Sequence, residues 1–288
     1  MASVINTNLL SLNAQRNTSA SQASLSLAVQ RLSSGLRVNW AKDDAAGLSI
    51  AERMSAQVRG STVAIRNAND GISLAQTADG ALAKVGDALQ RMRELAVQSR
   101  NATNTSADKD SLDKEFGELS KEIQRVLGGT TFNGRAILAT SAAGTQTFQV
   151  GANVTSNDRI EVATTDMTTA TEITTVAGTD NTGAGRAVID NTASGTTIDT
   201  VISNIDTAIN KVSSERATLG AAQNRFDQVI SNLQISVENQ SAAKSRITDA
   251  DFAAETANLS RANILQQAGN AMIAQANQIP SQVLSLLR

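Results

Sequence analysis

Residues 198–237 read IDTVISNIDTAINKVSSERATLGAAQNRFDQVISNLQISV, and the apolar spacing of this stretch decides the fold. Steps of four and three alternate along it, which is the repeat of a helix that packs lengthwise against other helices. Ten of the twelve repeat positions hold Ile, Val, Leu or Phe, and only Arg216 and Gln223 interrupt them. The positions are 198, 202, 205, 209, 212, 216, 219, 223, 226, 230, 233 and 237. The pattern predicts one helix of about 40 residues, roughly 60 Å long.

Two other stretches carry the same alternation and supply partners for this helix. The first has Leu82, Val85, Leu89, Met92 and Ala96 at its repeat positions. The second has Leu112, Phe116, Leu119, Ile123 and Val126. Helices with matching apolar seams pack into a bundle. The sequence therefore predicts a mainly α fold built as a long-helix coiled-coil bundle.

Both ends of the chain show the helical repeat with an uncharged outer surface. The repeat positions are Leu25, Val29, Leu32 and Leu36 near the front, and Leu265, Met272, Ile279 and Leu286 near the back. The opposite faces carry Ser, Thr, Asn and Gln, whereas a solvated helix normally carries charge. Two interpretations remain open: a two-helix hairpin with an amide-rich exterior, or helices whose faces are covered in an assembly of many copies.

The helical pattern disappears between residues 135 and 200. Apolar and polar residues alternate on both sides of Gly151, which predicts a small β-hairpin at about 146–162. Residues 163–200 are rich in Thr and poor in large apolar side chains, and predict a variable surface loop or a very small β element.

The composition excludes several classes of function. There are 25 Lys and Arg against 27 Asp and Glu, a formal net charge of −2, so no basic field exists to hold nucleic acid. The absence of Cys and His removes thiolate and imidazole chemistry and His-based zinc sites. Residues 262–287 carry no charge, but Gln and Asn interrupt them too often for a membrane span. We expect no enzyme, no cofactor, no metal and no membrane insertion.

Two close pairs of carboxylates invite a catalytic interpretation. They are Asp43 with Asp44, and Asp249 with Asp251, and both pairs stand where helices are predicted to begin. Acidic residues at a helix start accept backbone N–H groups and complement the helix dipole. We therefore interpret these acids as helix caps.

The stretch around Arg91 places side chains away from the bundle seam. Met92 and Ala96 face the seam, so Arg91 and Leu95 are expected to point elsewhere, and Leu95 is expected to be exposed.

Several long motifs, in order, resemble bacterial flagellin, the subunit of the flagellar filament. They are MASVINTNLLSLNAQRN, RLSSGLRVN, AKDDAAGLSI, NANDGISLAQTADGAL, LQRMRELAVQS, FNGRAIL, FQVGAN and the segment from Ser245 to Arg288. The resemblance spans about three quarters of the chain. It implies a terminal coiled-coil domain, residues 1–40 plus 250–288, that lines the filament core and channel, and a helical-bundle domain, residues 41–249.

The same resemblance implies a role, a location and partners. The role is a structural subunit that self-assembles into a helical filament for motility, found outside the cell after export through the flagellar type III apparatus. Expected partners are further copies of the chain, an export chaperone, and the cap and hook-junction proteins. Host Toll-like receptor 5 and an inflammasome sensor are further partners, and Arg91, Leu95 and Glu115 match the positions that the receptor recognises in the family.

Two rival functions are weighed against the filament subunit. A hook-filament junction protein shares terminal helices, but the full motif set disfavours it. A filament protein with a zinc peptidase insert is excluded because the chain has no His and the loop is too short.

Trp40, the only Trp in the chain, departs from the family pattern, which usually has a small residue at this position. It lies where the terminal helix should pass into the bundle. We expect the indole to pack against a neighbouring protofilament and to bias this junction.

Overall fold

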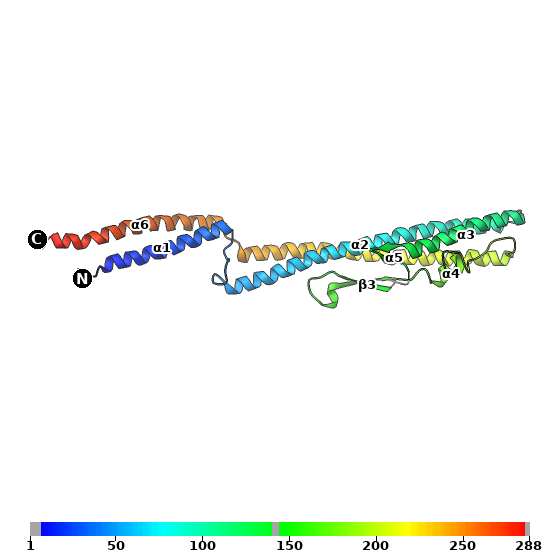
Figure 1. Ribbon diagram of the computed structural model, residues 1–288, viewed down its shortest axis with the longest axis horizontal. Coiled ribbons are helices and arrows are strands. Elements are labelled where there is room, and N and C mark those ends of the chain that lie inside the picture. The colour runs from blue at the N-terminus through cyan, green and yellow to red at the C-terminus, as the bar shows by residue number, and fades with distance from the viewer. Residues whose placement is uncertain (1–6, 140–143, 286–288) are drawn as a thin grey trace. The chain divides into compact units, whose positions relative to one another are not determined.

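The computed structural model describes residues 7–139 and 144–285, with side chains described as far as residue 278 (Figure 1). Its helices are α1 (Leu9–Ser34), α2 (Ala45–Ser99), α3 (Ser106–Gly129), α4 (Thr171–Ala177), α5 (Gly195–Thr248) and α6 (Phe252–Ser285). Its strands are β1 (Thr131–Phe132), β2 (Arg135–Ala136), β3 (Gly144–Gln149) and β4 (Arg159–Thr164), with a 3₁₀ turn, η1, at Ser156–Asp158. The predicted mainly α fold is confirmed.

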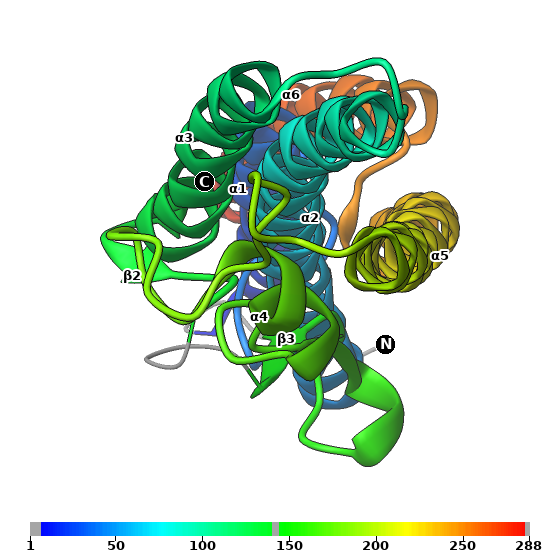
Figure 2. The ribbon, with the colours of Figure 1, turned by 90° about the vertical axis from the view of Figure 1, so that its right-hand side faces the viewer.

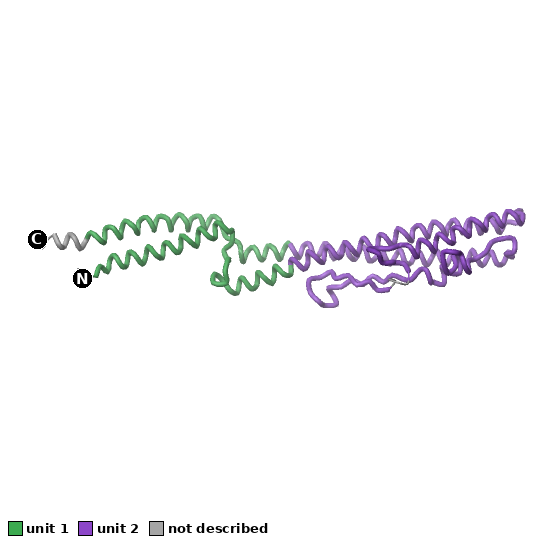
Figure 3. Tube along the Cα trace, in the orientation of Figure 1, with its two compact units in different colours: residues 1–57, 238–288 green, residues 58–237 purple. Residues whose placement is uncertain are grey.

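The chain divides into two compact units (Figure 3). Residues 1–57 with 238–288 form the first, here called the terminal unit, and residues 58–237 form the second, the bundle unit. Helices α2 and α5 contribute residues to both units.

The bundle unit is built on the repeat in α5. Every seventh residue of that seam is buried: Ile198, Ile205, Val212, Leu219 and Phe226. The last four of them share one apolar core with the predicted seams of α2 and α3, and Figure 2 shows these helices end-on. The predicted three-helix bundle is confirmed. Arg216, which interrupts the α5 repeat, donates from Nε to Asp79 Oδ1 of α2 at 2.7 Å, so the interruption serves an interhelical ion pair.

Two further ion pairs fix how α2 and α5 align. Arg93 of α2 and Arg100, the residue directly after its end, stand seven residues apart. They pair with Asp206 and Asp199 of α5, which stand seven residues apart in the opposite direction. The two helices therefore run antiparallel in one register.

The predicted β-hairpin is also confirmed. Strands β3 and β4 pair antiparallel with Phe148 opposite Ile160. The Phe148 ring meets the Phe226 ring edge-on, with centroids 5.4 Å apart. The Phe226 ring in turn lies so close to Gly71 of α2 that a Cβ there would be 2.6 Å from its Cζ. The aromatic pair thus ties the hairpin to the bundle, and the Asn67 side-chain amide of α2 adds a hydrogen bond to the Gln149 carbonyl at 2.9 Å.

The Thr-rich segment differs from the predicted loop. It contains helix α4, it ends where α5 begins at Gly195, and it buries Met167, Ile173 and Val176 in the bundle core. Few large apolar residues are needed, because the segment covers only one side of an existing bundle. Its turns are built by Asp-x-Thr sequences: Asp180 and Asp190 each accept the backbone N–H and the hydroxyl of the Thr two residues on.

Candidate functional site

Of the four acids predicted to cap helices, Asp44 and Asp251 are confirmed. Asp43 accepts backbone N–H groups within the linker before α2, and Asp249 accepts hydroxyl groups at the end of α5, so neither of these two caps a helix start. Asp44 Oδ1 accepts the backbone N–H of Gly47 at the start of α2. Asp251 Oδ1 accepts the N–H groups of Ala253 and Ala254 at the start of α6. Within residues 7–139 and 144–285, no cluster of three or more acidic side chains is arranged to hold a metal ion. In the same residues no helix is long and apolar enough to cross a membrane.

Helices α1 and α6 of the terminal unit lie side by side and pack through small side chains (Figure 1). The residues that face the partner helix recur in steps of three and four. On α1 they are Ser11, Ala14, Thr18, Ser21, Leu25, Ala28 and Leu32, and on α6 they are Glu255, Leu259, Ala262, Gln266, Gly269, Ile273 and Ala276. We call these two rows the terminal seam. A Cβ added at Gly269 would lie 2.4 Å from Thr18 Oγ1, so the helices approach closely there.

The terminal seam differs from the apolar repeats that the sequence predicted near the N- and C-terminal ends of the chain. Leu25, Leu32 and Leu36 are half-buried, but Val29, Leu265 and Met272 are 50%, 50% and 61% exposed. The side chain of Ile279 and the whole of Leu286 lie outside the described residues. Small residues occupy the seam because they let the two backbones approach closely, and this places larger apolar side chains outside the contact.

Polar contacts fix the register of the terminal seam at its two ends. Asn8 caps α1 by accepting the Ser11 N–H, and its side-chain amide donates to the Ala276 carbonyl at 2.8 Å. At the other end Arg31 lies 3.9 Å from Glu255, whose side chain is 11% exposed. A polar pair within an otherwise small and apolar contact favours one alignment of the helices over shifted ones.

The outward faces of this helix pair carry large apolar side chains. Leu9, Leu10, Leu12, Leu27, Val29, Ile264, Leu265 and Met272 are all between 37% and 68% exposed. Charge is sparse there, because α1 has only Arg16 and Arg31 and α6 has only Glu255 and Arg261. A groove of about 400 Å³, lined by Leu10, Leu265, Met272 and uncharged neighbours, lies between the two helices. Such a surface is typical of a protein–protein contact.

The two linkers that leave this helix pair are hydrogen-bonded to each other. The chain turns at Gly35, whose φ of 70° is left-handed, and its carbonyl accepts the Ala250 N–H at 2.9 Å. Leu36 forms a bridge with Asp249, and the Arg37 N–H donates to the Thr248 carbonyl. Trp40 follows in this linker and is 63% exposed.

The predicted receptor surface is only partly on the outside of the bundle. Arg91 donates to Glu115 at 2.8 Å and to Glu94 at 2.9 Å, and all three side chains are about half exposed or more. The hydrogen bond to Glu115, followed by that to Glu94, raises the pKa of Arg91. Leu95 is fully buried, so the prediction that it is exposed was wrong. The reason lies one turn further on, where the buried Ser99 hydroxyl donates to the Ile189 carbonyl: the segment after α4 covers this face of α2.

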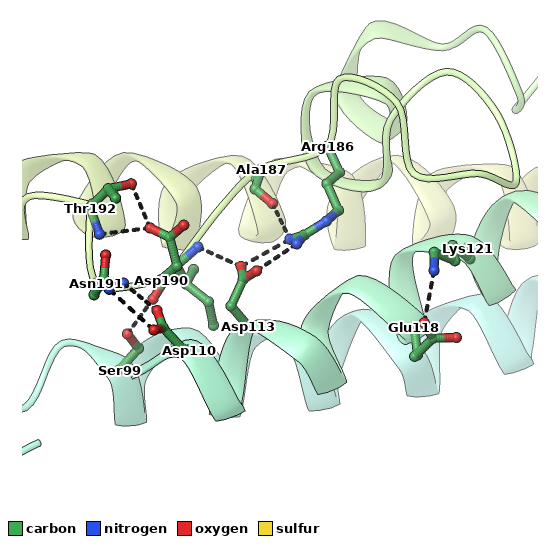
Figure 4. A network of polar contacts seen from close by, with 11 residues as sticks. Ser99, Asp110, Asp113, Glu118, Lys121, Arg186, Ala187, Asp190, Asn191 and Thr192 are labelled. Carbon is green, nitrogen blue, oxygen red and sulfur yellow. Dashed lines mark hydrogen bonds and ion pairs between the residues drawn. The ribbon is translucent and has the colours of Figure 1, made fainter. Parts of the chain in front are cut away.

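A second row on α3, missed in the sequence, holds that segment. Its members recur in steps of three and four: Asp110, Asp113, Gly117, Ser120 and Gln124. Figure 4 shows Asp113 between Arg186 and the chain near Asp190, and Asp110 beside Asn191. Ser120 and Gln124 donate to the carbonyls of Ala177 and Gly178. The sequence signal for this row is a repeat of polar and small residues on α3, next to the apolar repeat of the same helix.

Comparisons with known proteins match nearly the whole chain. The family described as "Bacterial flagellin N-terminal helical region" matches residues 5–143, and "Bacterial flagellin C-terminal helical region" matches residues 202–287. A flagellin of Halalkalibacterium halodurans is 47% identical over 285 residues, covering 99% of this chain and 100% of the relative. A flagellin of Bacillus subtilis is 42% identical, covering 99% of each. A flagellin of Xenorhabdus nematophila is 43% identical over both full lengths.

Solved structures are similar as well. The crystal structure of Bacillus cereus flagellin has 36% sequence identity and a TM-score of 0.48, covering 58% of this chain and 88% of that one.

Proposed function

Because this chain belongs to the bacterial flagellin family, we propose that its α1 and α6 pair is the part that contacts other copies in the filament. The chain is a structural subunit of the flagellar filament, an extracellular appendage. The match to both terminal regions does not favour the hook-filament junction alternative. The family is one of structural proteins rather than enzymes.

The observation that carries this proposal is the arrangement of side chains on the helix pair. Small residues make up most of the contact between α1 and α6, and a row of large apolar residues faces outward. The apolar area therefore remains available for copies of the same chain. A patch that contacts a different patch on the next copy generates an open helical polymer. Val29, Leu265 and Met272 are proposed assembly contacts on this ground, whereas Leu25 and Leu32 belong to the terminal seam and Leu36 is half-buried in the linker after α1.

The domain roles follow the same division. Residues 1–40 with 250–288 are proposed as the coiled-coil domain of the filament core and channel, and residues 41–249 as the helical-bundle domain. The boundary between the two compact units differs from this division, because it lies within α2, after residue 57, and within α5, before residue 238. Both ends of the chain then belong to the part that assembles.

Further proposed partners come from the resemblance to the family. They are the type III export apparatus with its chaperone, the filament cap and the hook-junction proteins, together with a host inflammasome sensor. For Toll-like receptor 5, Arg91 and Glu115 support recognition because both are exposed on the bundle. Leu95 contacts a receptor only if the segment after α4 moves, because that segment covers it.

Seeded polymerisation tests the assembly role. Purified chain added to short filament fragments is expected to elongate them, as seen by electron microscopy. Substituting Leu265 or Met272 with Asn should raise the concentration needed for growth, because an exposed apolar contact is lost. Val97 of α2 is similarly exposed at 49%, so Val97→Asn is a matched control outside the helix pair. A chain that binds fragments without extending them would contradict the proposal.

A further inference from the structure

The linker between α1 and α2 holds Trp40 in a fixed turn. The Asp43 carboxylate accepts the backbone N–H groups of Asn39 and Trp40, both at 3.0 Å. The Asp43 N–H donates back to the Trp40 carbonyl at 2.9 Å. These backbone hydrogen bonds stabilise the carboxylate and lower the pKa of Asp43, and the bond from Asn39 has the largest effect. The turn around the indole is closed from both sides.

The base of this turn is anchored as well. Val38, two residues earlier, is 3% exposed, and its N–H and that of Arg37 both donate to the Thr248 carbonyl. The Arg37 guanidinium donates to the carbonyl of Ile247 at 2.6 Å. Position 40 therefore stands on a backbone tied to the end of α5, rather than on a free linker.

The side chain on this turn nevertheless faces solvent. Trp40 is 63% exposed, and the chain has one Trp, five Phe and no Tyr. A large apolar side chain on a fixed backbone loses little conformational freedom when it binds, which is why such residues act as anchors of interfaces. Because the Trp40 side chain is mostly exposed in the single chain, its apolar surface remains free to contact another molecule.

We propose that Trp40 is an intersubunit anchor that docks on a second copy of this chain in the filament. The inference rests on the proposed assembly function, which identifies the partner of Trp40. In a filament every subunit is permanently surrounded by identical copies of the chain, so each Trp40 has a copy to contact. The contact is between different patches of the two copies, as open polymerisation requires. Because the turn is bonded to the end of α5, docking there also holds the junction between α1 and α2 and resists its twisting.

The fluorescence of the chain tests this directly, since its tryptophan emission comes from Trp40 alone. The measurement compares emission and acrylamide quenching of the unpolymerised chain with those of filaments grown from seeds. We expect an exposed, readily quenched indole in the single chain. In filaments the emission should move to shorter wavelength and quenching should fall several-fold. Filaments with an unchanged, fully quenchable indole would overturn the anchor while leaving the assembly function intact. Seeds that do not elongate would overturn both.

Crosslinking tests whether the surface that covers Trp40 in the filament belongs to another copy of the chain. The chain has no Cys, so Trp40→Cys gives a single attachment point for a photoactivated crosslinker. Products of twice the chain mass are expected from filaments and not from the unpolymerised protein at equal concentration. Products of single-chain mass only would overturn the proposal.

The substitution Trp40→Ser measures the strength of the contact. It is expected to raise the critical concentration for polymerisation by about tenfold. Trp40→Phe should raise it less, because an apolar ring remains. Circular dichroism of both unpolymerised variants should match the parent, because the indole is mostly exposed. An unchanged critical concentration in Trp40→Ser would contradict the anchor.

Discussion

The guanidinium of Arg186 donates to both carboxylate oxygens of Asp113, from Nη1 to Oδ1 at 2.9 Å and from Nη2 to Oδ2 at 2.5 Å. The two side chains are only 19% and 12% exposed. Asp113 Oδ1 also accepts the buried backbone N–H of Ile189. One carboxylate on α3 therefore holds two points of the segment that covers Leu95.

Removing this carboxylate should loosen the bundle unit. Asp113→Ala leaves a mostly buried guanidinium and a backbone N–H without their acceptor, so we expect the free energy of unfolding to fall by about 3 kcal/mol. Chemical denaturation followed by circular dichroism measures the change. The matched control is Glu118→Ala on the same helix, which breaks the exposed pair with Lys121 and should cost less than about 1 kcal/mol. Equal losses in the two variants would contradict the role of Asp113.

Two glycines of α2 should respond in opposite ways to the same substitution. At Gly71 a Cβ would lie 2.6 Å from Phe226, whose ring is itself held by Phe148. Gly71→Ala should therefore destabilise the bundle unit by about 1–3 kcal/mol through overpacking. At Gly80 no atom lies within 4 Å of the added Cβ, so Gly80→Ala should stabilise the helix by up to about 1 kcal/mol. Thermal unfolding of the two variants side by side tests this, and a stabilised Gly71→Ala would refute it.

The sequence predicted the bundle because its contacts are made by large apolar residues at regular spacing. Ile198, Ile205 and Phe226 were identified from the repeat alone, and all three are fully buried. The terminal seam is equally regular, but Ser, Ala, Thr and Gly form most of it. A search for large apolar residues therefore found the outward rows at Leu265 and Met272 instead of the contact.

Leu95 shows a second limit of the sequence. Leu95 falls outside the repeat formed by Met92 and Ala96, yet it is buried in the same apolar core, because a helix with two sets of neighbours buries two faces. The covering chain arrives from residues 187–190, far along the sequence, and is held by the polar row on α3. Nothing in the local pattern of α2 contains that information.

The Asp-x-Thr turns after β4 should make this segment sensitive to acid. Hydrogen bonds from Thr182 and Thr192 lower the pKa values of Asp180 and Asp190, respectively. The largest effect comes from the Thr hydroxyl in each case. An unfolded Asp has a pKa of about 3.9. The stabilisation is complete above that value and is lost as the pH falls through the lower folded pKa values, because the unfolded state then binds more protons.

Carboxyl NMR titration measures these folded values. Both Asp180 and Asp190 should titrate below the pH of an unfolded Asp. Thr192→Val removes the hydroxyl that contributes most to the shift, so it should raise the pKa of Asp190 and leave that of Asp180 in place. An unchanged titration of Asp190 in this variant would show that the turn does not set its pKa.

The helix pair α1 and α6 should be the least protected helical part of the unpolymerised chain. As far as its side chains are described, to residue 278, its buried apolar residues are Ala28, Ala262 and Ala276, whereas the bundle unit buries Phe, Leu, Ile and Met. Burial of larger apolar area makes local opening more costly, so backbone amides of α1 and α6 should exchange at least about a hundredfold faster than those of α5 between residues 198 and 226. Assembly should slow them, because the outward side chains Leu10, Leu265 and Met272 then become covered. Hydrogen exchange read by mass spectrometry on the single chain and on filaments makes both comparisons. Equal protection of the two regions before assembly would mean that the terminal seam is stable by itself, and would remove the reason for expecting the outward apolar faces to drive assembly.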